Sequence, residues 1–131
     1  MRRILKLLVL GISIMCFSIS ASAAIAIQPF ADANASTISL SFSGSTAYCS
    51  LTINGATGTT KIDNCTVTLR ESNGTLINQW TNQSATGTRL SFDKSTTTVT
   101  KNKTYTLSFS ATIYRNGKTE PISGSITKTY T

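Results

Sequence analysis

The chain has 131 residues, of which 13% are charged, 40% hydrophobic and 8% aromatic, and this length fits one small domain. It contains no histidine, which excludes a Ser-His-Asp or Cys-His catalytic arrangement, a zinc site with histidine ligands and a histidine pH switch. Twelve basic and five acidic residues give a formal net charge of +7 at pH 7.

The N-terminal segment has the three parts of a secretory signal peptide: a positive start, an apolar middle and a small-x-small cleavage site. These parts are Arg2, Arg3 and Lys6, then residues 7–19, then Ala21-Ser22-Ala23. We expect residues 1–23 to be cleaved and the protein to act outside the cell, released or associated with the cell surface. The alternative is a retained membrane anchor, since no charge interrupts residues 7–27.

Removal of the signal peptide leaves nine basic and five acidic residues, a net charge of +4. Lys94, Lys101 and Lys103 lie in one stretch, but no stacking aromatic side chains are interleaved with them. We interpret them as solvated surface residues and predict no nucleic-acid partner. We also expect no stable membrane association after cleavage.

Two cysteines, Cys49 and Cys65, remain after removal of the signal peptide. An exported chain with two cysteines usually pairs them, so a Cys49–Cys65 disulfide is predicted. The chain-entropy model assigns such a short loop roughly 3 kcal/mol of stabilisation. The spacing is not Cys-x-x-Cys, which favours a structural bond over a redox pair.

Apolar and polar residues alternate along most of the mature chain, as strands with one buried face require. The longest run contains Tyr105, Leu107, Phe109, Ala111 and Ile113. The remaining alternating segments are residues 38–42, 49–53, 65–69, 76–80, 90–92 and 122–130.

The connections between these segments carry turn signals. Asn73-Gly74 and Asn116-Gly117 can adopt the positive φ angles of a type I′ hairpin turn. The longer connection at residues 54–60 has two interpretations. If it closes a hairpin, Cys49 lies opposite Cys65; if it crosses between sheets, the bond bridges the two layers.

No segment of the mature chain shows a helical pattern, and serine and threonine supply 37 of its residues. About seven short strands separated by turns predict an all-β, antiparallel, immunoglobulin-like β-sandwich. We expect a flexible leader at residues 24–35 and the sandwich at residues 36–131. Tyr105, at the start of the longest strand, is either a tyrosine corner or one more core aromatic.

A resemblance to a known group supports this fold. The chain resembles small secreted, single-domain proteins of Gram-positive anaerobic bacteria, which are expected to be immunoglobulin-like. The resemblance implies fold and export, and it transfers no functional residue. Its motifs are Ile27-Gln28-Pro29, Thr46-Ala47-Tyr48-Cys49, Gly58-Thr59-Thr60-Lys61-Ile62, Thr68-Leu69, Trp80, Gly87 and Val99-Thr100-Lys101-Asn102-Lys103-Thr104-Tyr105-Thr106-Leu107.

The acidic residues indicate no enzyme. They lie beside turns and strand ends, with neither a pair aimed into a cleft nor calcium-loop spacing. They are Asp32, Asp63, Glu71, Asp93 and Glu120. We therefore predict no catalytic residue, no metal site and no cofactor. Lys61 beside Asp63 and Asn64 is the nearest grouping to an internal lysine–asparagine crosslink, but the alternation favours a solvated cluster.

Exposed aromatic side chains would be candidates for ligand binding. Trp80 would suit a carbohydrate, but its parity with Leu76 favours a core position. Tyr48 and Tyr114 alternate away from their apolar neighbours and are better candidates for exposed aromatics. Tyr130 and Gly117 match two positions of chaperone-assembled pilins, a match that we attribute to chance because a turn already explains Gly117.

The sequence predicts a secreted, non-enzymatic binding module with an extracellular protein or glycan partner, whose ligand-binding residues it does not identify. The alternative is a structural subunit of a surface layer or fibre, assembled through edge strands. The oligomeric state stays open at this point.

Overall fold

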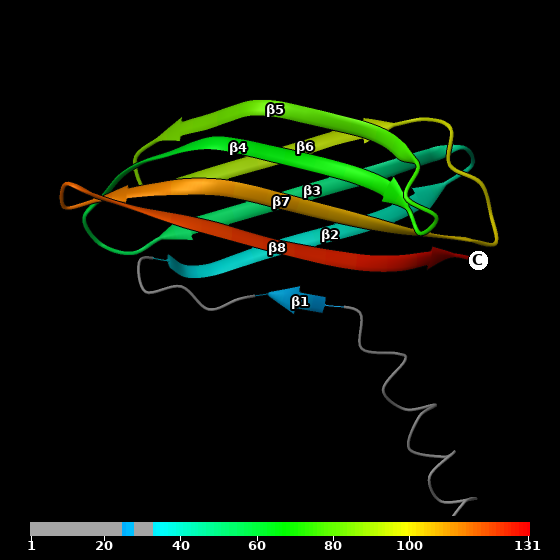
Figure 1. Ribbon diagram of the computed structural model, residues 1–131, viewed down its shortest axis with the longest axis horizontal. Coiled ribbons are helices and arrows are strands. Elements are labelled where there is room, and N and C mark those ends of the chain that lie inside the picture. Colours follow the sequence, from blue (N-terminus) through cyan, green and yellow to red (C-terminus); the bar gives the residue numbers. More distant parts are fainter. Residues whose placement is uncertain (1–24, 28–32) are drawn as a thin grey trace, which may run out of the picture.

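Two antiparallel sheets pack face to face in the structure, a computed structural model that describes residues 25–27 and 33–131, with side chains from Ser36 onward (Figure 1). The three-stranded sheet has the order β2 (Ala33–Ser43), β3 (Thr46–Gly55), β6 (Arg89–Thr96). The five-stranded sheet has the order β1 (Ile25–Ile27), β8 (Lys118–Tyr130), β7 (Lys103–Arg115), β4 (Thr59–Glu71), β5 (Leu76–Thr86).

The predicted fold class is confirmed, because all seven alternating segments form the strands β2 to β8. The expected signal peptide, residues 1–23, lies outside the described residues, and so do Asp32 and part of the expected leader. Within that leader, Ile25–Ile27 form β1, which pairs with Gly124 to Ile126 of β8. The first strand of the sandwich, β2, already begins at Ala33.

From β2 onward, the chain crosses between the sheets three times, after β3, after β5 and after β6. The crossing after β3 settles the two interpretations of residues 54–60: β3 and β4 belong to different sheets. Backbone hydrogen bonds join this crossing to the one after β5, from Gly55 N to Thr88 O and from Gly87 N to Thr60 O, each 2.7 Å. They tie the two sheets together at one end of the molecule.

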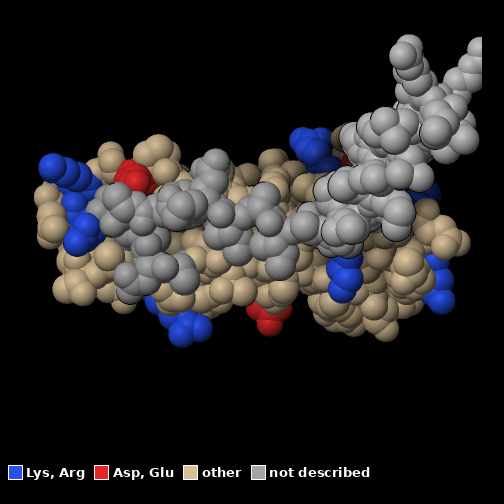
Figure 2. Space-filling view, turned by 90° about the horizontal axis from the view of Figure 1, so that it is seen from below, with Lys and Arg blue, Asp and Glu red and all other residues tan. Residues whose placement is uncertain are grey.

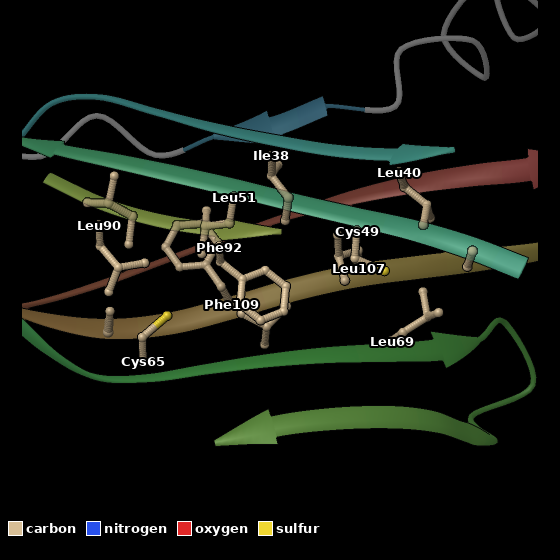
Figure 3. Packing of buried hydrophobic residues seen from close by; sticks show 14 of the residues in the cluster. Ile38, Leu40, Cys49, Leu51, Cys65, Leu69, Leu90, Phe92, Leu107 and Phe109 are labelled. Carbon is tan, nitrogen blue, oxygen red and sulfur yellow. The ribbon is translucent and has the colours of Figure 1, made fainter. Parts of the chain in front are cut away.

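The core lies between the sheets, where the inward side chains of both layers interdigitate (Figure 3). Period-two alternation explains its composition, because every second residue of a strand faces the partner sheet. Leu51 and Ile53 of β3 contribute to this layer from one sheet and Val67 and Leu69 of β4 from the other, and all four are at most 1% exposed. Such burial of apolar surface is the main stabilising term of the sandwich.

An aromatic cluster closes the opposite end of the core. Phe42 stacks on Tyr130 with ring centroids 4.8 Å apart and lies 5.5 Å from Tyr105. The Tyr130 hydroxyl donates a hydrogen bond to the Gly44 carbonyl oxygen at 2.8 Å, and the Tyr105 hydroxyl accepts one from the Thr100 N–H at 2.9 Å. Tyr105 therefore forms the predicted tyrosine corner and is also a core residue.

One of the two predicted turn types is wrong. Asn116 and Gly117 both have positive φ, 52° and 74°, as a type I′ turn requires. At Asn73-Gly74 only the glycine does, at 95°. There the Gly74 N–H bonds to Glu71 O, and the Asn73 side chain accepts a bond from the Thr75 N–H. The hairpin is present, but its turn is the three-residue kind that ends in a left-handed glycine.

The predicted disulfide is absent from the structure, in which Cys49 and Cys65 are free, buried thiols. Cys49 projects from β3 and Cys65 from β4, so they belong to different sheets. Figure 3 shows them at different positions along the sandwich, with Phe92 and Phe109 between them. In this arrangement the two thiols remain unpaired.

Candidate functional site

The outer face of the five-stranded sheet is hollowed where β4, β7 and β8 lie side by side. The hollow has a volume of about 460 Å³ and is open to solvent. Its lining residues are mostly small or polar, with one proline, one isoleucine and no charged group: Asn64, Ser110, Ala111, Thr112, Pro121, Ile122 and Ser123. We call this feature the groove.

A β-bulge in β4 places Asn64 in the groove. The register of β4 against β7 shifts between Asp63, which pairs with Thr112, and Thr66, which pairs with Ser110. Asn64 adopts a left-handed φ of 51° in this interval, a conformation that asparagine tolerates better than most residues. Its N–H donates to Asp63 Oδ1 at 2.8 Å, which holds the bulge in place. Bulges of this kind re-aim side chains next to binding sites.

Three side chains flank the groove at one end. Lys61 Nζ lies 3.4 Å from Asp63 Oδ2 and 4.2 Å from the centroid of the Tyr114 ring. The Lys61 side chain is 47% exposed, so the predicted solvated cluster is present and the buried environment that a crosslink needs is not. A surface ion pair of this geometry adds little stability. Its main effect is to fix the position of the Lys61 cation beside the groove.

The polar side chains of the groove are unoccupied by internal partners. Over the described part of the chain, neither the side-chain amide of Asn64 nor the hydroxyls of Ser110, Thr112 and Ser123 hydrogen-bond to another protein group. By contrast, Thr104 and Thr129 farther along the same face hydrogen-bond to each other at 2.8 Å. The groove therefore offers free donors and acceptors to a ligand from a rigid sheet.

A second notable surface lies on the opposite side of the sandwich, on the outer face of the three-stranded sheet. Tyr48 of β3 is 47% exposed there, which confirms its predicted exposure. It lies between Ser41 of β2 and Ser95 of β6 in the strand register. Ser50 donates to Asp93 Oδ1 at 3.3 Å on the same face. Most of the outward side chains around Tyr48 carry small hydroxyl groups.

The other aromatic and basic candidates lie elsewhere. Trp80 is half-buried and contacts Phe92 edge-on at 5.3 Å, so it packs against the core as predicted. Leu76, predicted to share its buried face, is 48% exposed because the register of β4 against β5 shifts next to it. Lys103 pairs with Glu71 at 3.2 Å. Figure 2 shows basic side chains scattered over the face in view rather than gathered in one patch.

Residues 25–27 and 33–131 contain no helix long and apolar enough to cross a membrane. Over the same ranges no three Cys, Asp or Glu side chains are grouped to hold a metal ion. Two positions match those of pilins, Tyr130 and Gly117. Tyr130 hydrogen-bonds to Gly44 at the end of the core, and Gly117 lies in the β7–β8 turn. Their roles are therefore local to this fold.

Comparison with known proteins gives only a structural likeness. No family model and no curated protein matches the chain. The β-glucuronidase of Parabacteroides merdae matches with a TM-score of 0.47 and 11% identity over 71% of this chain and 13% of its own. A glycosyl hydrolase family 2 member from Bacteroides cellulosilyticus matches with a TM-score of 0.46 and 12% identity over 70% of this chain and 15% of its own. The chain spans less than a sixth of either protein.

Sequence reasoning missed the groove, although one signal was present. Ile62 is buried at an even position of β4, whereas Cys65, Val67 and Leu69 are buried at odd positions. A change of parity inside one strand requires an extra residue, which is a bulge. No comparable signal marks Ser110 or Ser123, because they belong to regularly alternating strands.

Proposed function

We propose that the protein is a secreted, non-enzymatic binding module that holds an extracellular protein or glycan partner in the groove. The observation that carries this proposal is the group of unpaired polar side chains around Asn64, held in a concave site on a rigid sheet. Concave sites with a few convergent polar groups are where proteins usually bind ligands. The predicted signal peptide supports action outside the cell.

The charged neighbours of the groove favour binding over catalysis. The Asp63 carboxylate accepts a hydrogen bond from the Asn64 N–H and pairs with the Lys61 ammonium, and its side chain is partly exposed. A general acid needs a carboxyl that keeps its proton near neutral pH, usually through burial. No carboxylate lines the groove itself. These features support a non-enzymatic role.

A variant that fills the groove tests the proposal. Ser110→Trp adds an indole to the lining, while Thr81→Trp adds the same bulk on β5, outside it. Labelled mature protein is applied to a panel of purified mucins, matrix proteins and extracellular polysaccharides. We expect Ser110→Trp to lose binding at least tenfold and Thr81→Trp to retain it. Equal binding by both variants, or no binding by the unsubstituted protein, contradicts the proposal.

A structural role is the second candidate, and the two edges of the five-stranded sheet favour it. At one edge, β5 is irregular: its pairing with β4 shifts three times, and Asn82 has a left-handed φ of 56°. Such irregularity protects an edge against pairing with other strands. At the other edge, β8 pairs with β7 in one unbroken register, and among the described residues β1 covers it at Gly124 to Ile126 alone.

Light scattering coupled to size-exclusion chromatography distinguishes these roles. A binding module stays monomeric as the protein concentration rises, whereas edge-strand pairing produces concentration-dependent polymers. If polymers form, Ser123→Pro and Thr127→Pro in the exposed parts of β8 should suppress them, because proline removes a backbone donor. Polymers that persist in both variants would show that β8 is not the assembling edge.

A further inference from the structure

We infer that the outer face of the three-stranded sheet is a second binding surface, specific for an extended neutral polysaccharide, with Tyr48 as its stacking platform. This face lies on the side of the sandwich opposite to the groove, behind the five-stranded sheet in Figure 1. The inference is independent of the proposed role of the groove.

The strand registers define a three-by-three grid of outward side chains. Its central column comes from β3, and its outer columns come from β2 and β6. Seven of the nine side chains are serine or threonine, one is tyrosine and one is aspartate. The three rows are Ser41, Tyr48 and Ser95; Ser39, Ser50 and Asp93; and Thr37, Thr52 and Ser91.

Tyr48 is a stacking platform because its ring has no partner. In the described part of the chain it makes no aromatic contact, and its hydroxyl makes no hydrogen bond. Tyr114 on the other sheet differs, since Lys61 covers its ring. The flanking Ser41 and Ser95 are too small to shield Tyr48. An exposed aromatic face beside hydroxyl groups can pack against the C–H face of a sugar ring while its neighbours hydrogen-bond to the sugar hydroxyls.

The charge of the grid selects a neutral ligand. The grid contains no lysine or arginine, and its one charged group is the Asp93 carboxylate, which also accepts a hydrogen bond from Ser50. The row beyond Thr52 pairs Asn54 with the exposed Arg89, so the face as a whole has one charge of each sign and no excess of positive charge to attract an acidic polymer. A carboxylate can accept further hydrogen bonds from sugar hydroxyls. It repels uronates, sulfated glycans and phosphate-rich polymers. The charge pattern therefore favours an uncharged polymer over an acidic one.

The size of the grid favours a polysaccharide over a folded protein. Strand and residue spacings make it about 10 Å by 14 Å between its outermost Cα atoms. A stable protein interface buries about 800 Å² on each partner and usually has several large side chains at its centre. This grid has one. A flat, narrow strip with a single ring suits a ribbon-like chain that repeats the same contact along its length and gains affinity by multivalency.

Adsorption to insoluble polysaccharides tests the inference. Mature protein is incubated with cellulose, chitin and starch granules, with calcium pectate as the acidic comparator, and the unbound fraction is measured. We expect adsorption to at least one neutral polymer, weaker adsorption to pectate, and a roughly tenfold loss of affinity for Tyr48→Ala. Tyr48→Phe should retain most of the affinity because it keeps the ring. Tyr48 lies outside the core, so the variants should fold, which circular dichroism verifies.

Thr81→Trp is the control variant, and we expect it to leave adsorption unchanged, because Thr81 lies on β5 of the other sheet and outside the groove. Ser110→Trp, which fills the groove, shows which of the two surfaces the polymer occupies. If Ser110→Trp abolishes adsorption and Tyr48→Ala does not, the polysaccharide binds in the groove, and the inference about Tyr48 is wrong while the role of the groove stands. Adsorption to no neutral polymer, or equal adsorption to pectate, also overturns the inference.

Discussion

The hydroxyl of Tyr105 accepts a hydrogen bond from the backbone N–H of Thr100, 2.9 Å away and five residues earlier in the chain. The bond spans the loop by which the chain passes from β6 to β7, and so from one sheet to the other. The ring of Tyr105 is 1% exposed. One side chain therefore anchors an irregular connection to the core.

Replacement of Tyr105 by phenylalanine isolates this hydrogen bond. Tyr105→Phe keeps the buried ring but leaves the Thr100 N–H without its partner, so we expect a loss of about 1–2 kcal/mol in the free energy of unfolding. Urea unfolding measures it. Tyr48→Phe is the matched control, because it removes an unpartnered hydroxyl and should change stability by less than about 0.5 kcal/mol. Equal effects would show that the Tyr105 bond contributes nothing.

The two buried thiols predict a stability change at alkaline pH. Burial raises the pKa of Cys49 and of Cys65 from 9.0 to about 11. Above pH 9 the unfolded chain releases these protons while the folded chain retains them, so unfolding becomes more favourable. The stabilising contribution is complete below pH 9 and is lost as pH rises towards 11, by roughly 2 kcal/mol for each thiol.

The double variant Cys49→Ala and Cys65→Ala provides the reference, because it retains all other groups that titrate in this range. Urea unfolding of both proteins between pH 8 and about pH 11 should show a steeper decline for the unsubstituted protein. Parallel curves would contradict the burial argument. A thiol reagent should label both cysteines in urea and neither in the folded protein. A reduction-sensitive mass would show instead that the bond forms.

A side chain at Gly117 should destabilise the β7–β8 hairpin. Its φ of 74° is left-handed, and a Cβ added there meets no atom within 4 Å, so backbone strain alone opposes a side chain. We expect Gly117→Ala to destabilise the protein by about 1 kcal/mol. Lys118→Ala, the next residue along the exposed hairpin, should have no measurable effect. Thermal unfolding compares them, and equal melting temperatures would contradict the turn assignment.

Trp80 and Leu76 lie on the same strand but should differ in energetic importance. Trp80 packs edge-on against Phe92 across the two sheets, whereas Leu76 is 48% exposed. We expect Trp80→Ala to cost about 2 kcal/mol or more, since it leaves a gap beside the core. Leu76→Ala should stay within about 0.5 kcal/mol. Denaturant unfolding followed by circular dichroism compares the pair, and a larger effect at Leu76 would contradict the assigned faces.

The sequence alone determined the strands and most of the buried faces. The alternation from Tyr105 to Ile113 predicts a strand with five inward side chains, and all five are buried. Asn116-Gly117 predicts the tight turn that follows. These predictions succeed because period-two alternation and glycine conformation act between residues that are close in the chain.

Only the tertiary structure decided which strands lie together and what their surfaces form. The alternation correctly places Cys49 and Cys65 among the inward-facing residues of their strands. They nevertheless enter the core from different sheets and at different positions along the sandwich, and they remain unpaired. The groove at Asn64 and the grid around Tyr48 each combine two consecutive strands with a third strand from a distant part of the chain. The local alternation of apolar and polar residues indicates which face of a strand a side chain lies on. Which other side chains lie beside it on that face depends on the pairing and packing of distant segments.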